Sequence, residues 1–278
     1  MMIARATAVL GFTIVMSITL AACADEDRPP PPPQPGESFA QLDSGERGRF
    51  LLGRALFERL ATAGEGLGPL YNAERCSACH DQPTSGGGSA RVPVVKATRF
   101  ADGVCSSLRE LGGDNIQQLA TEALVAHGIG PEEIPEAATH VSEVTAPPLF
   151  GLGLIEAVPD AALEALADPD DVDGDGVSGR LAKLADGRSA RFGRKGDTHS
   201  VAEFVDTALR FELGFTTPSY TAEETRNGQA IPPEADPMPD PEIDAETLGL
   251  IADYVRLLAP PAPEYGFSEA ARDSVEQG

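Results

Sequence analysis

Two stretches of the chain repeat apolar residues with the period of an α-helix. The first covers residues 44–61, where Ser44 can cap the start. The second covers residues 244–261, where Asp244 is suited to the N-cap and Pro260 ends the helix. We therefore predict two amphipathic helices, one early and one late in the chain. Their apolar positions are Phe50, Leu51, Ala55, Leu56 and Leu60 in the first, and Leu248, Ile251, Ala252, Val255 and Leu258 in the second.

An apolar run also opens the chain, behind the single basic residue Arg5. Residues 6–20 are mostly apolar, but they are too short to cross a bilayer comfortably. The sequence LAAC at residues 20–23 resembles a bacterial lipobox, in which the cysteine, here Cys23, is lipidated after cleavage. An ordinary secretory signal that ends near this cysteine is the alternative. We favour a lipoprotein whose signal peptide is residues 1–22.

Residues 23–43 follow as a polar, proline-rich stretch with five consecutive prolines. Such a run keeps an extended polyproline II conformation and buries nothing. The stretch therefore predicts a semi-rigid linker between a lipid anchor at Cys23 and a folded domain over residues 44–278. Together, the signal and the anchor predict an exported protein on the periplasmic side of a bacterial membrane.

The charge of the chain limits its partners. Lys and Arg total 21 against 44 Asp and Glu, which gives a net charge of -23. An acidic surface repels nucleic acid and anionic membranes, so we expect no nucleic-acid partner and membrane contact through the lipid anchor only. The 29 Gly and 24 Pro predict many turns between modest helices.

The strongest chemical signal is ERCSACH at residues 74–80. Cys76 and Cys79 are spaced C-x-x-C and His80 follows at once, which is the attachment pattern of a c-type haem. Thiols at this spacing can form thioethers with the two vinyl groups of one porphyrin, and the histidine becomes the proximal ligand of the iron. Zinc would need a second ligand pair, and a thioredoxin-like redox pair would need a βαβ setting. A structural disulfide is the plainer alternative.

Longer stretches of the chain narrow the choice of haem protein. They are GLGPLYNAERCSACH (66–80), the run beginning TAPPLFGLGLIEAVPD (145–180) and the run beginning ARFGRKGDTHSVAEF (190–220). These stretches resemble the bacterial di-haem oxidoreductase family, whose members are also labelled thiol oxidoreductases and are related to di-haem cytochrome c peroxidases. EIDAETLGLIADYVRLLAPPAP (242–263) fits the same pattern, so the resemblance covers most of residues 45–278.

The motif and the resemblance together predict a mainly α fold with a cytochrome c-like haem core. Residues 44–83 and 238–262 would form this core, with the two amphipathic helices crossing as in class I cytochromes c. Residues 84–237 would wrap the haem as a long insertion of loops and helices. A covalent haem c is the cofactor implied, and a redox protein, such as another cytochrome, is the partner.

The chain departs from the family pattern in two places. The family has a second C-x-x-C-H in a C-terminal segment, whereas this sequence ends about where the helix leading to it would begin. The chain is therefore interpreted as a fragment or as a single-haem variant. The family also tends to have Trp in an FGWK segment, where this chain has Arg194. Enzyme activity, peroxidase-like or as a thiol oxidoreductase, is predicted only if the second haem segment exists.

The distal ligand of the iron has several candidates. Met238 precedes the second predicted helix in a Met-Pro pair, where class I cytochromes place their ligand. A surface methionine in a proline-rich loop is the alternative. Other candidates for the sixth position are His127, His140, His199 and the unpaired Cys105.

An open sixth position would instead suit peroxide chemistry, which needs an acid–base group above the iron. Glu156, in the apolar run GLGLIEAVPD, is the catalytic carboxylate to test, because apolar surroundings would raise its pKa. A glutamate that faces solvent is the plainer interpretation.

A second candidate metal site is the acidic run DPDDVDGDGVSGR at residues 168–180. Asp171, Asp173 and Asp175 alternate before a glycine, as in the first half of an EF-hand loop, which predicts calcium. The twelfth position is Ala182, so the bidentate glutamate is missing. An acidic turn that binds no ion is the alternative.

The sequence thus predicts an exported c-type haem protein that transfers electrons as part of a di-haem oxidoreductase. The rival functions are a single-haem electron carrier with no substrate of its own and a non-redox lipoprotein that binds a partner.

Overall fold

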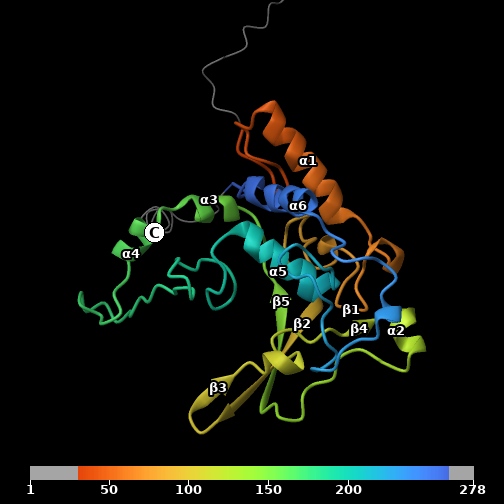
Figure 1. Ribbon diagram of the computed structural model, residues 1–278. Coiled ribbons are helices and arrows are strands. Elements are labelled where there is room, and N and C mark those ends of the chain that lie inside the picture. Colours follow the sequence, from red (N-terminus) through yellow and green to blue (C-terminus); the bar gives the residue numbers. More distant parts are fainter. Residues whose placement is uncertain (1–30, 263–278) are drawn as a thin grey trace, which may run out of the picture. The chain divides into compact units, whose positions relative to one another are not determined.

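Helices and antiparallel strands share the folded part of this chain. The computed structural model describes residues 31–262, and from Pro32 on they belong to one compact unit (Figure 1). The structure is 30% helical and 18% strand. The mainly α fold expected from the sequence is therefore wrong, because the residues between the two predicted helices form sheets as well as helices.

The helices and strands follow one another in this order along the described residues. The helices are α1 (Ser44–Glu58), α2 (Glu122–Ala126), α3 (Leu152–Ala157), α4 (Asp160–Ala165), α5 (Val201–Leu213) and α6 (Ala245–Leu257). The strands are β1 (Leu70–Tyr71), β2 (Ser89–Ala101), β3 (Val104–Ser106), β4 (Leu119–Ala120) and β5 (His140–Ala146). Short 3-10 turns are η1 (Ala63–Glu65), η2 (Cys76–Ala78), η3 (Arg109–Leu111) and η4 (Pro233–Ala235).

Helix α1 confirms the first predicted helix, although it begins on a different cap. The carboxylate of Asp43 accepts a hydrogen bond from the Glu46 amide at 2.8 Å, and the Glu46 carboxylate accepts one from the Asp43 amide at 3.0 Å. This reciprocal pair is a capping box. Asp43 is therefore the N-cap, and the expectation that Ser44 caps the helix is wrong, because Ser44 is already the first helical residue.

Helix α6 confirms the second predicted helix, and it packs against α1, which it crosses at an angle (Figure 1). Asp244 is its N-cap and accepts from the Thr247 amide at 2.7 Å. At Gly53 of α1, a β-carbon would come 2.0 Å from the carbonyl oxygen of Leu250 on α6. The missing side chain at Gly53 therefore permits the close approach of the two helices.

Helix α5 completes the apolar core by packing against α6, α3 and β1. Ser200 caps its start, and Gly214 ends it in the left-handed conformation that favours glycine. The core gathers buried side chains from α1, α5, α6 and their connecting loops. They are Phe50, Phe57, Ala61, Leu67, Leu149, Phe192, Val201, Val205, Leu209, Leu213, Phe215, Ile243, Ile251, Ala252, Tyr254, Val255 and Leu258.

The larger sheet lies in the stretch that was expected to hold only loops and helices. β2 pairs with β3 on one side and with β5 on the other, and both pairings are antiparallel. Asp102 and Gly103, both with positive φ, turn the chain between β2 and β3. An Asp-Gly pair beside a run rich in β-branched residues is a hairpin signal, and it explains these strands. β1 and β4 form a second, smaller antiparallel pair.

The proline-rich stretch joins the folded unit before residue 44. The Phe39 amide donates to the Leu257 carbonyl at 3.2 Å, and the Ala259 amide donates to the Glu37 carbonyl at 3.0 Å. Residues just before α1 therefore pair with the end of α6. The predicted signal peptide and lipidation site lie outside the described residues.

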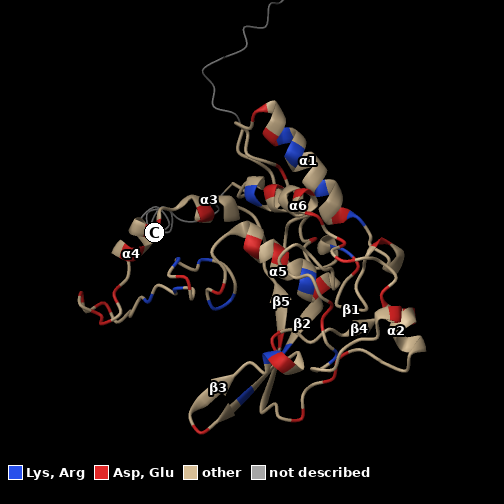
Figure 2. Cartoon of the chain, in the orientation of Figure 1, with Lys and Arg blue, Asp and Glu red and all other residues tan. Residues whose placement is uncertain are grey.

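Two surface properties bear on the expected location and partners. Over residues 31–262, no helix combines the length and the apolar character that crossing a bilayer requires. Acidic side chains occur on most elements and form a run in the loop after α4 (Figure 2).

Candidate functional site

The C-x-x-C-H motif folds into one tight turn beside α1. Its first three residues form η2, which contacts α1. The amides of Cys79 and His80 both donate to the Cys76 carbonyl, at 3.2 and 3.1 Å. The backbone therefore gathers two thiols and an imidazole within a single turn of chain.

The imidazole of His80 is held in a defined orientation. Its Nδ1 lies 3.1 Å from the carbonyl oxygen of Gly87 and 3.1 Å from that of Pro147. Carbonyl oxygens only accept, so Nδ1 carries the hydrogen and Nε2 keeps its lone pair. Histidines that ligate metals are oriented by such bonds. Burial lowers the pKa of His80 against the effect of the two carbonyl contacts, and this favours the neutral, ligating imidazole.

The two motif cysteines are unpaired thiols in a shielded position. Cys79 is buried and Cys76 is partly buried. Burial raises the pKa of Cys76 to about 12 and that of Cys79 to about 11, so both thiols are protonated at neutral pH. The structural disulfide that the sequence left open is not formed between them.

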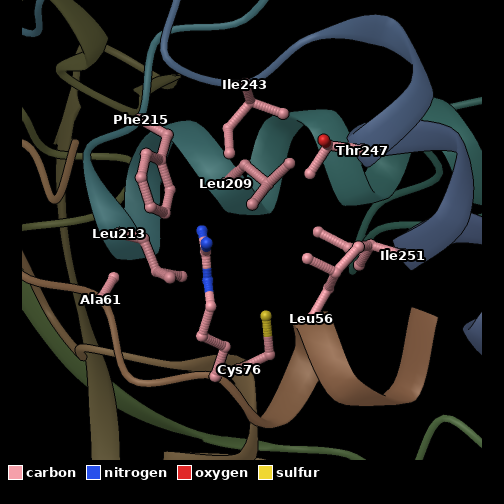
Figure 3. A pocket seen from close by; sticks show the side chains of 10 residues that line it. Leu56, Ala61, Cys76, Leu209, Leu213, Phe215, Ile243, Thr247 and Ile251 are labelled. Carbon is pink, nitrogen blue, oxygen red and sulfur yellow. The ribbon is translucent and has the colours of Figure 1, made fainter. Parts of the chain in front are cut away.

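A small hollow lies beside Cys76. Figure 3 shows the Cys76 sulfur directed into it, between Leu56 of α1 and Leu213 of α5. The remaining wall comes from all three core helices and the loops near them. It consists of Arg59, Ala61, Leu209, Phe215, Ile243, Thr247 and Ile251.

These residues fit a covalently attached haem. A porphyrin is largely apolar with a polar edge, and the hollow beside the Cys76 thiol is lined mostly by apolar side chains, with Arg59 and Thr247 as its polar members. Nε2 of His80 is available to a metal because Nδ1 is committed to Gly87 and Pro147. Cys76, Cys79 and His80 are therefore the residues that could hold the group.

Met238 is not among the residues that line the hollow. It is partly buried, and its amide donates to the Asp236 carboxylate at 3.1 Å. His127 and His140 are exposed, and Cys105 is exposed on β3. The ring of His199 is fixed by Nδ1, 2.7 Å from the Ser189 carbonyl oxygen. The structure brings none of these candidates to the wall of the hollow, and the distal ligand stays a prediction.

Glu156 is held in an ion pair on α3. Its carboxylate accepts from Arg256 Nε at 2.5 Å and from the Val201 amide at 2.8 Å. Burial acts to raise its pKa, but the hydrogen bonds from Arg256 and Val201 outweigh burial, and the pKa of Glu156 is lowered. The expected rise in pKa is therefore wrong, because the apolar run in sequence is not the environment of the carboxylate in space.

The acidic loop after α4 brings three carboxylates together, but not the predicted three. Asp168, Asp171 and Asp173 each offer an oxygen, and these oxygens lie within 4.8 Å of one another. The Asp175 carboxylate instead accepts from the Val177 amide at 2.7 Å. Asp168 was missed, although it is the first residue of the acidic run at residues 168–180.

The segment containing this loop and the carbonyl of Pro147 matches a known family. Residues 139–232 match the family model described as di-haem oxidoreductase, putative peroxidase. The match covers 94 of the 278 residues, about a third of the chain, and it supports the resemblance to this family. The family recognised from the sequence is therefore confirmed, and it implies a haem cofactor. No curated protein and no solved structure matches the chain.

The di-haem oxidoreductase segment contributes to the site without containing the C-x-x-C-H motif. It supplies the Pro147 carbonyl that orients His80, and it supplies Leu209 and Leu213 to the hollow. Cys76 lies outside the matched residues. The candidate site therefore joins the motif to the family segment in space.

A second group of carboxylates escaped the sequence analysis. Glu223, Asp236, Asp240 and Glu242 offer oxygens that lie within 4.8 Å of one another. Burial, and then the charges of Glu242, Asp236 and Asp240, raise the pKa of Glu223 to about 8. The signal was weak, because these residues are scattered through a polar loop and meet only in the folded chain.

Proposed function

We propose that this protein is an exported c-type haem protein that transfers electrons within a di-haem oxidoreductase. The observation that carries the proposal is the orientation of His80. Its Nδ1 lies within hydrogen-bond distance of two carbonyl oxygens, and the turn that contains His80 also contains two unpaired thiols. The family match supports haem and an oxidoreductase role. Haem bound here supplies reversible one-electron chemistry at its iron.

The residues of the site have separate roles in this proposal. Cys76 and Cys79 hold the porphyrin through thioethers, and His80 ligates the iron through Nε2. The apolar side chains that line the hollow, including Leu209 and Leu213, would limit the contact of the haem with water. A low-polarity surrounding of this kind tunes the reduction potential of a metal site.

Covalent attachment is tested by removing both thiols. Cys76→Ala with Cys79→Ala, expressed with a c-type maturation system, should lose the haem-stained band on a denaturing gel, because thioethers survive denaturation and ligand-only haem does not. Cys105→Ala is the matched control, since this exposed cysteine lies on β3 and should leave the band intact. A stained band retained by the double variant would refute the assignment.

Peroxidase-like activity and simple electron transfer remain two roles for such a site. The family description supports the first. The engagement of Glu156 by Arg256 favours the second, because a paired carboxylate is less suited to acid–base chemistry. An absorption spectrum recorded with and without peroxide separates them. A spectrum that does not respond to peroxide assigns the carrier role, and formation of an oxidised species assigns the enzyme.

Export and lipid anchoring form a further part of the proposal. They are supported by the apolar run at residues 6–20 and the LAAC sequence that ends at Cys23. Cys23→Ser should move the protein from the membrane fraction to the soluble periplasmic fraction, since lipid is the expected contact. A variant that stays in the salt-washed membrane pellet would exclude the lipobox.

Calcium is proposed for the loop after α4, now with Asp168 in the set. The support is the approach of the Asp168, Asp171 and Asp173 oxygens to within 4.8 Å. Calorimetric titration with calcium should show one binding event that Asp171→Asn removes. Equal heats in the two proteins would exclude this loop as the site.

The partner is proposed to be a redox protein with a cationic face, such as another cytochrome. The net charge of -23 supports this, and acidic residues occur on most of the elements in Figure 2. Association of opposite charges is slowed by salt. The rate of electron exchange with a basic cytochrome should therefore fall as ionic strength rises, and a salt-independent rate would contradict the proposal.

A further inference from the structure

Glu212 is a partly buried carboxylate on α5 that the proposed roles leave unused. It accepts from Nδ2 of Asn115 at 2.8 Å and from Nδ2 of Asn72 at 3.1 Å. The two amides also bond to each other, since Asn72 Nδ2 donates to Asn115 Oδ1 at 3.0 Å. The side-chain donors to this carboxylate are therefore uncharged, and its negative charge is not neutralised by a hydrogen-bonded cation.

The backbone places Glu212 beside the haem-attachment turn. Its carbonyl oxygen accepts from the amides of Asn72 at 2.7 Å and Ala73 at 3.1 Å, and this segment leads directly to Cys76. Its neighbours on α5, Leu209 and Leu213, line the hollow into which the Cys76 thiol is directed. Glu212 thus belongs to the part of α5 that faces the motif.

The carboxylate also acts electrostatically on both thiols. Burial is the main cause of the raised pKa of Cys76 and Cys79, and the charge of Glu212 contributes to both. The two thiols hold one porphyrin, so a charge that acts on both thiols acts on the porphyrin as well. This interaction is stronger than in water, because the charges are partly buried. A reduction at this site therefore changes the free energy of the ionised carboxylate.

Other titratable groups around Glu212 do not provide an alternative proton site. Lys96 of β2 is the charged side chain that acts on it. β1 brings Tyr71, whose pKa is raised by burial, so this phenol stays neutral. On the α3 and α6 side, Glu156 and Arg256 pair with each other near Val201, at the opposite end of α5. The thiols of Cys76 and Cys79 become uncharged thioethers on attachment.

We propose that Glu212 takes up one proton when the haem site gains one electron. This inference rests on the proposed haem function. The electron comes from the redox protein partner and reduces ferric iron to ferrous iron, and the proton passes from solvent water to the Glu212 carboxylate. The net charge of the site is then unchanged, and oxidation returns the proton.

The hydrogen bonds and the surroundings of Glu212 suit this role. Burial raises its pKa, against the bonds from Asn72 and Asn115 and the charge of Lys96. Burial thus favours the protonated form of the Glu212 carboxyl, and an electron added nearby favours that form further. The bonds from the two amides hold the carboxylate in place in either state.

The test is the midpoint potential of the haem-loaded protein, measured by spectroelectrochemistry from pH 5 to 9. One proton taken up per electron changes the reduction equilibrium tenfold per pH unit, which is about 59 mV for a one-electron couple. We expect a slope that approaches this value over part of the range, and a flat profile in Glu212→Gln. Glu74→Gln is the matched control, because Glu74 is exposed close to the motif and should leave the slope unchanged. An unchanged slope in Glu212→Gln overturns the inference.

A second variant decides the question if Glu212→Gln fails to retain haem. Asn115→Ala removes a hydrogen bond that favours the ionised carboxylate, so the pH-dependent range should move to higher pH. A range that does not move overturns the inference. Wild-type protein without covalent haem would refute the proposed function itself. Wild-type protein with covalent haem and a pH-independent potential would refute only the role of Glu212.

Discussion

Replacement of Gly53 by alanine tests the close packing of α1 against α6. A β-carbon at this position would lie 2.0 Å from the Leu250 carbonyl oxygen and 2.8 Å from the Tyr254 β-carbon, and the first of these belongs to the backbone. The helices must therefore move apart, since backbone cannot rotate away as a side chain does. Overpacking of this kind costs about 1–3 kcal/mol.

Gly48→Ala is the matched control on the same helix. A β-carbon at Gly48 meets nothing within 4 Å, so this variant reports only the higher helix propensity of alanine. That propensity should raise the free energy of unfolding by about 1 kcal/mol. Gly53→Ala receives the same gain and the packing cost, so it should be less stable than Gly48→Ala by about 1–3 kcal/mol. For a domain of this size, each kcal/mol shifts the melting temperature by roughly 2–4 °C.

Thermal unfolding followed by far-UV circular dichroism measures this difference. The haem absorption band gives a second reading, because α1 carries Phe57, whose ring centroid is 6.2 Å from that of His80. Separation of the helices should therefore disturb the band in Gly53→Ala and not in Gly48→Ala. Equal melting temperatures for the two variants would refute the packing of α1 and α6 described here.

Two further substitutions test the titrating carboxylates. Glu223→Gln should stabilise the protein by about 4 kcal/mol at pH 8 and have little effect at pH 4, because the stability tied to a raised pKa is present at low pH and lost as the pH rises toward the folded value of about 8. Denaturant titrations at both pH values check this, and a pH-independent effect would contradict it. Glu156→Gln should destabilise the protein by about 1 kcal/mol at pH 7, because the lowered pKa of Glu156 stabilises only its ionised form. This loss of stability should vanish as the pH falls below about 4. A loss that persists at low pH would show that Arg256 is not the cause.

Local signals in the sequence predicted the two long helices and the turn that carries the thiols. Asp244 and the apolar repeat define α6 because capping and periodicity act over a few residues. The Asp102-Gly103 turn shows that a hairpin signal was present in the stretch assigned to loops and helices. The mainly α prediction failed there because the cytochrome resemblance concerned the ends of the folded domain.

The partners of the site residues depend on contacts that no local pattern contains. His80 is oriented partly by the carbonyl of Pro147, which comes from a distant part of the chain. Glu156 lies in an apolar run of the sequence, but in the folded chain its carboxylate pairs with Arg256 of α6. The acidic loop after α4 was recognised, because its carboxylates are close along the chain as well. Sequence spacing thus identified the chemical groups, and the fold determined which of them interact.

The pairing of α1 with α6 has a consequence for the order of events during biogenesis. Contacts between segments far apart in the chain form slowly, because a long loop must close first. Cys76 and Cys79 emerge early in synthesis, whereas Thr247 and Ile251 of α6 form part of the wall beside Cys76. The thiols are therefore expected to be open to the attachment machinery until α6 docks. A chain arrested before residue 244 should accept haem readily, and apo-protein that has already folded should accept it slowly.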